Sequence, residues 1–222
     1  AMIKKGWLPP VRTIQEKTIA LLAFFGFSGH TAWEDYYFKQ QLKVAFRISL
    51  TKTNKPYAIS AWLRRGELQA ADLNAKNYSE KKFKEALSEL KILMAKSPAN
   101  FFNELRNICL EAGVKVVHTS SLSKTPISGS TRWLKDTPLI QLTDRYNRND
   151  EFWFTFFHEA GHILLHGKKG IFIEKVEYSD KDKVKEQEAA EFDGRWLLTN
   201  EEERGIMDAK PFDERKIQWF SW

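Results

Sequence analysis

Cysteine is almost absent from this sequence: Cys109 is the single one among 222 residues. One cysteine cannot build a disulfide framework within the chain, and it rules out zinc modules made from several thiolates. The sequence also lacks an apolar run long enough to span a bilayer, and its N-terminus lacks the pattern of a signal peptide. We therefore expect a cytoplasmic protein with no membrane partner.

The composition is that of an ordinary soluble globular protein, with 42% hydrophobic and 29% charged residues. The 16 Phe and 8 Trp residues are enough for a sizeable core. The net charge of +6 is unevenly spread: residues 1–99 carry 17 Lys and Arg against 8 Asp and Glu, whereas residues 151–222 carry 11 against 16. The basic front fits either a DNA or acidic partner, or lysines scattered over solvated helix faces.

The pattern of apolar residues changes near residue 113. Helical spacing predicts helices over 11–25, 31–49, 79–96, 98–112, 151–166 and 182–198, and one or two helices over 57–74. Short β-rich runs predict strands over 114–118, 127–134 and 138–142. We expect a helical N-terminal region over residues 1–97 and an α+β domain over residues 98–222.

The sequence His158-Glu159-Ala160-Gly161-His162 lies within one of the predicted helices. Because a helix turns once in 3.6 residues, the imidazoles of His158 and His162 project from the same face and can share one zinc ion. Glu159 lies one step round the helix, where its carboxylate can reach a water on the open zinc position and act as general base. The alternative is a pair of core histidines beside a surface glutamate.

A catalytic zinc site needs a third protein ligand. The acidic candidates downstream are Glu174, Glu177, Asp180, Asp182, Glu186, Glu188, Glu191 and Asp193. Three of them, Glu186, Glu188 and Glu191, lie on the next predicted helix, where Glu188 immediately precedes the small residues Ala189 and Ala190, which favour tight helix packing. Periodicity alone does not separate Glu188 from Glu191.

The stretch Phe154–Gly167, followed by Glu188–Leu198, resembles the ImmA/IrrE family of metallopeptidase domains. In that family one helix carries His-Glu-x-x-His and a second carries Glu-Ala-Asn-x-Phe-Ala, whose Glu is the third ligand. The segment Glu188–Asp193 matches at the Glu, the first Ala and the Phe, and departs at Ala190 and Asp193. The resemblance covers residues 113–199 and implies that His158, His162 and Glu188 bind zinc and that Glu159 is catalytic.

The resemblance also implies a fold and a function. The expected fold is a zincin-like α+β domain, with a small three-stranded sheet and a zinc-binding helix pair, preceded by a helical spacer. The expected function is a zinc metalloendopeptidase that cleaves a protein substrate such as a DNA-binding repressor of a mobile element or stress-response gene. The alternative is a non-catalytic, antitoxin-like or transcriptional regulator with a structural or sensory zinc site. Either could contact DNA through a helix-turn-helix, a motif with no visible pattern in this chain, and the oligomeric state stays open.

Other residues near the motif have less certain roles. His166 is expected to form a hydrogen bond near the helix end rather than to bind the metal. Arg145, Tyr146 and Arg148 precede the zinc helix and are either oxyanion-stabilising groups or surface residues of a polar turn. Either Ile127–Leu134 or Pro138–Leu142 could offer a strand edge to an extended peptide.

Overall fold

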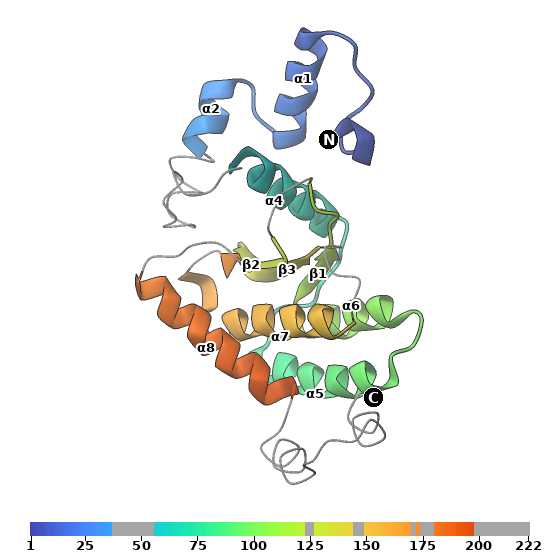
Figure 1. The fold of residues 1–222 in the computed structure, drawn as a ribbon, viewed down its shortest axis with the longest axis vertical. Coiled ribbons are helices and arrows are strands. Elements are labelled where there is room, and N and C mark those ends of the chain that lie inside the picture. Colours follow the sequence, from blue (N-terminus) through green and yellow to red (C-terminus); the bar gives the residue numbers. More distant parts are fainter. Residues whose placement is uncertain (37–55, 123–126, 144–148, 170–171, 174–179, 198–222) are drawn as a thin grey trace, which may run out of the picture.

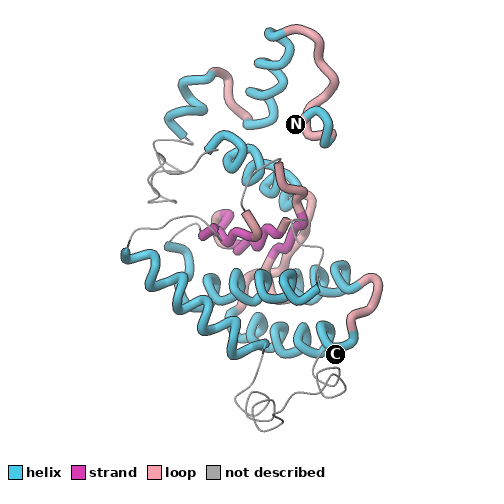
Figure 2. The backbone as a smooth tube through the Cα atoms, viewed as in Figure 1, coloured by secondary structure: helices cyan, strands magenta, loops and turns pink. Residues whose placement is uncertain are grey.

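The computed structural model describes residues 1–36, 56–122, 127–143, 149–169, 172–173 and 180–197. The expected α+β class is confirmed, with helices on both sides of one small sheet (Figure 2). In chain order the elements are η1 (Ile3–Lys5), α1 (Ile14–Phe25), α2 (His30–Glu34), α4 (Pro56–Ala71), α5 (Glu80–Lys96), α6 (Phe101–Glu111), β1 (Lys115–His118), β2 (Gly129–Leu134), β3 (Thr137–Leu142), α7 (Asn149–His166), η3 (Gly167–Lys169), β4 (Phe172–Ile173) and α8 (Asp180–Leu197). Most of the helix expected over 31–49 lies outside the described residues.

The sheet is mixed and has the strand order β1-β3-β2-β4. Strands β2 and β3 form an antiparallel hairpin around the short turn at Lys135, which has a left-handed φ of 59°. Strand β1 runs parallel to β3 on the other side. The two-residue strand β4 adds to β2 by pairing with Ser130 and Thr131, and it was not expected from the sequence.

Helix α7 covers one face of the sheet (Figure 1). Helix α6 lies beside α7, and helix α5 lies beyond α7 on the side away from the sheet. The main core forms between these elements, because each helix turns an apolar stripe toward the others. Its members include Phe83, Leu87 and Leu90 of α5, together with Trp153 and Phe156 of α7. Helix α5 therefore shares a core with the domain expected over 98–222, and the division at residue 97 stays a prediction.

Helix α4 covers the opposite face of the sheet and is held there by buried polar side chains. Gln141 Nε2 of β3 donates to the Trp62 carbonyl at 2.7 Å, and Arg132 of β2 donates to the Leu63 carbonyl at 2.7 Å. Gly66 permits this approach, since a Cβ there would overlap the side-chain amide of Gln141. Helices α1 and α2 pack on the far side of α4 in a second apolar cluster, around Phe24, Phe25 and Trp62.

Candidate metal centre

Helix α7 presents the His-Glu-x-x-His motif from within the protein core. The apolar side chains on its inner face, Trp153, Phe156, Phe157 and Ala160, are fully or almost fully buried against the sheet and α6. The helix ends at His166, and Gly167 follows with a left-handed φ of 57°. Because the whole motif from His158 to His162 is buried, helix α7 gives it a rigid backbone.

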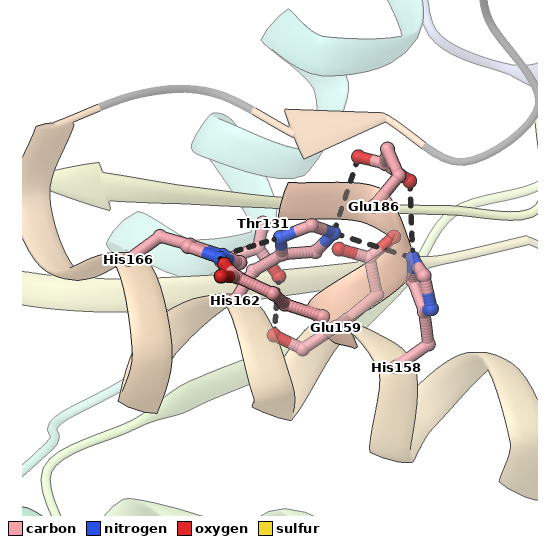
Figure 3. Close-up of polar contacts among 7 residues, drawn as sticks. Thr131, His158, Glu159, His162, His166 and Glu186 are labelled. Carbon is pink, nitrogen blue, oxygen red and sulfur yellow. Dashed lines mark hydrogen bonds and ion pairs between the residues drawn. The ribbon is translucent and has the colours of Figure 1, made fainter. Parts of the chain in front are cut away.

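Three side chains converge on one point between α7 and α8 (Figure 3). The Nε2 atoms of His158 and His162 lie 3.2 Å apart. The Glu186 carboxylate places Oε2 3.2 Å from His158 Nε2 and Oε1 3.3 Å from His162 Nε2. The histidine side chains are 6% and 1% exposed and that of Glu186 is 21% exposed, so the centre opens to solvent on the side of α8.

These separations fit a zinc ion. Ligand atoms of a tetrahedral zinc, with bonds of about 2.0–2.1 Å, lie about 3.3 Å from one another. The three measured separations are 3.2, 3.2 and 3.3 Å. Two imidazoles and one carboxylate are also the donor set of catalytic zinc sites that keep a fourth position for water. The residues present therefore fit zinc in both geometry and chemistry.

The ionisation of the cluster also favours a cation. Burial lowers the pKa of His162 to about 4, so its imidazole is neutral near pH 7 and able to bind a metal. Burial alone would raise the pKa of Glu186, but hydrogen bonds from His158 and His162 lower it to about 2. The centre thus combines a neutral imidazole with a carboxylate that stays negative.

The structure brings Glu186, and not the expected Glu188, to the two histidines. Two residues on a helix are about 200° apart, so Glu186 and Glu188 cannot present their carboxylates to the same point. The Glu188 carboxylate instead lies 2.9 Å from Nε2 of His166. The cluster in the structure therefore contains Glu186 in the position that the sequence prediction gave to Glu188. Glu191 is exposed, and its carboxylate accepts a hydrogen bond from Gln187 at 3.3 Å.

Helix α8 lies in this register because of the small and aromatic residues that face α7. Ala189 is completely buried, the ring of Phe192 lies against Gly161, and Trp196 stacks on Phe157 with ring centroids 6.0 Å apart. Glu186 lies three residues before Ala189, and Glu188 lies four residues before Phe192, so both flank this stripe on opposite sides. The sequence stripe alone therefore does not choose between the two glutamates, and the packed position of the helix brings Glu186 to the histidines.

Glu159 lies against strand β2. Its side chain is completely buried, and in Figure 3 its carboxylate is directed to the same side of α7 as the two imidazoles. A Cβ on Gly129 would lie 2.7 Å from Glu159 Oε1, so this glycine leaves the room that the carboxylate fills. The Thr131 hydroxyl donates to the Glu159 backbone carbonyl at 2.8 Å and joins β2 to the motif.

The remaining expectations have mixed outcomes. Arg145, Tyr146 and Arg148 lie outside the described residues, as do Glu174 and Glu177. Strand Pro138–Leu142 cannot offer a free edge, because β1 and β2 flank it. Strand β2 is covered by β4 along Ser130 and Thr131. Cys109 is fully buried, and burial raises the pKa of its thiol, so it is no nucleophile.

The comparisons with known proteins point to one family. The family model of the M78 peptidases, described as the IrrE N-terminal-like domain, matches residues 109–216. This span includes β1, the whole histidine motif and helix α8. No curated protein matches the chain. None of the described helices combines the length and apolar character needed to cross a membrane.

Proposed function

We propose, from the premise that residues 109–216 belong to the IrrE N-terminal-like peptidase family, that this protein is a zinc-dependent regulatory endopeptidase. In this proposal His158, His162 and Glu186 hold the zinc, and Glu159 is the catalytic residue. The observation that carries the proposal is the spacing of the three ligand atoms, which lie 3.2–3.3 Å apart as zinc ligands do.

The chain's own residues divide the work of hydrolysis. When bound, zinc lowers the pKa of a water ligand to about 7 and polarises the scissile carbonyl. The Glu159 carboxylate accepts the proton of the attacking water and returns it to the nitrogen of the leaving amine. Burial of Glu159 against Gly129 fixes where this proton is taken up.

The proposed substrate is a repressor or a similar regulatory protein. This part of the proposal comes from the family resemblance, in which such domains act on or are fused to regulators. A narrow substrate range is expected, and a general substrate such as casein is a poor probe. The basic residues 1–99 are compatible with a substrate or partner that is acidic or bound to DNA.

The second candidate is a non-catalytic regulator whose zinc site is structural or sensory. The excess of basic residues in the first 99 positions favours it. The position of Glu159 favours the peptidase, because a structural zinc site has no need of a buried carboxylate beside the ligands. The two candidates differ in what the loss of Glu159 does while zinc stays bound.

The test compares Glu159→Gln with His158→Ala and with the exposed control Glu191→Gln. Repressors encoded beside the gene are offered as substrates, and derepression of the neighbouring promoter is the biological readout. Glu159→Gln should keep its zinc and lose about 10²–10⁴-fold in cleavage rate, the usual share of general acid–base catalysis. His158→Ala should lose both zinc and cleavage. Full derepression by Glu159→Gln, with none by His158→Ala, would establish the non-catalytic regulator instead.

A further inference from the structure

A second carboxylate–histidine pair lies directly behind the metal centre. Nδ1 of His162 lies 3.0 Å from Nδ1 of His166, and Nε2 of His166 lies 2.9 Å from Oε2 of Glu188. His162 therefore uses one ring nitrogen toward the metal centre and the other toward this pair (Figure 3). His166 is 4% exposed and Glu188 is 53% exposed, so the chain of contacts runs from the core to the surface.

We propose that His166 and Glu188 are positioning residues that orient the His162 imidazole and fix its tautomer for metal binding. The proposal rests on the zinc site proposed above, and it concerns how that site is supported rather than what it cleaves. It gives Glu188 a role outside the set of ligands, in place of the direct role expected from the sequence.

The donors and acceptors of the chain allow one assignment when the metal is bound. His162 binds through Nε2, so a neutral His162 carries its proton on Nδ1 and donates it. The facing Nδ1 of His166 must then accept, which places the His166 proton on Nε2. That N–H donates to the Glu188 carboxylate, which can only accept. In this assignment each N–H faces an acceptor: His162 donates to His166, and His166 donates to Glu188.

The aromatic surroundings restrict the rings to this arrangement. Phe172 of β4 stacks on His162, with ring centroids 4.0 Å apart and planes 7° apart. The same ring lies 5.2 Å from the ring of His166. With one side covered by Phe172, hydrogen bonding through His166 decides which nitrogen of His162 faces the ligands.

Metal-bound histidines are commonly oriented by a carboxylate or carbonyl on their second nitrogen, and loss of that partner typically weakens metal affinity 10–100-fold. In this protein a histidine is inserted between the ligand and the carboxylate. We therefore expect Glu188 to act on zinc affinity through His166 alone.

The test is a double-mutant cycle on zinc affinity. Zinc dissociation constants are measured by competition with a chromophoric chelator for the wild type, His166→Ala, Glu188→Ala and the double variant, with Glu191→Ala as the control. Each single variant should bind zinc about 10–100-fold more weakly. The double variant should be no weaker than His166→Ala, and the control should match the wild type. Losses that add in the double variant would show that Glu188 acts on zinc affinity independently of His166, and unchanged affinities would show a surface pair with no role; either result overturns the proposal.

A spectroscopic measurement separates orientation from general packing. In the zinc-loaded protein, ¹⁵N NMR of the imidazoles should find the His166 proton on Nε2, and this preference should weaken in Glu188→Ala, where only the Nδ1–H of His162 still favours it. A proton on Nδ1 of His166 in the wild type would contradict the assignment. Because these readouts report metal binding and protonation, an inactive protein that binds zinc with this coupling would refute the peptidase and leave this proposal standing. A wild type that binds no zinc would end both.

Discussion

Replacing Gly129 by alanine tests whether strand β2 positions Glu159. The added Cβ would lie 2.7 Å from Glu159 Oε1 and 2.7 Å from Thr155 Cγ2, and 3.0 Å from Glu159 Cγ. Ordinary contacts of this kind are about 3.4 Å or longer, so the carboxylate must shift by roughly 0.7 Å or more. A misplacement of about 1 Å in a reacting group can cost about 10²-fold in rate. We expect Gly129→Ala to lose cleavage by about that factor.

Zinc binding should respond much less, because the atoms nearest to a Cβ on Gly129 belong to Glu159 and Thr155 and not to the three ligands. The assay pairs cleavage rates on the repressor substrate with zinc competition titrations and urea unfolding, where overpacking should lower stability by about 1–3 kcal/mol. The matched control is Gly194→Ala, since a Cβ there meets nothing within 4 Å. Adding Gly129→Ala to Glu159→Gln should give no further loss of rate. A Gly129→Ala enzyme as fast as the wild type would refute this role for Glu159 or its placement.

Two further predictions concern stability. Gly66→Ala should destabilise the protein by about 2–4 kcal/mol in urea unfolding, because the Cβ would displace the buried Gln141 amide from the Trp62 carbonyl. Adding Gln141→Ala should recover part of the lost stability. A Gly66→Ala protein more stable than the wild type would contradict this docking of α4. In the metal-free protein, burial lowers the pKa of His162 to about 4. The unfolded chain takes up that proton near pH 6.5, so stability should fall as the pH drops from about 6.5 to 4, by on the order of 3 kcal/mol. In His162→Gln the free energy of unfolding should not show this fall with pH. An equal pH dependence of stability in both proteins would be evidence against a buried neutral His162.

Much of the fold could be predicted because its signals are local. The apolar spacing in 151–166 and the β-rich runs near 114–142 predicted α7 and three of the strands close to their observed bounds. The pair His158 and His162 could be predicted for the same reason, since helical geometry alone places both rings on one face.

The remaining features depend on contacts that the local pattern does not contain. Strand β4 has two residues, too few for any periodic signal, and it forms by pairing with β2. The docking of α4 depends on the side chains of Arg132 and Gln141, which a pattern of apolar residues cannot show. The choice of Glu186 over Glu188 is set by the packing of α8 against Gly161, because that contact fixes the rotation of the helix.

The central claim is that His158, His162 and Glu186 together bind one zinc ion. Crystals of the zinc-loaded protein, measured on both sides of the zinc absorption edge, locate the metal and its ligands directly. We expect one anomalous peak per chain, about 2.0–2.1 Å from Nε2 of both histidines and from the Glu186 carboxylate, with Glu188 on His166. A peak coordinated by Glu188, or one away from the two histidines, would contradict the account.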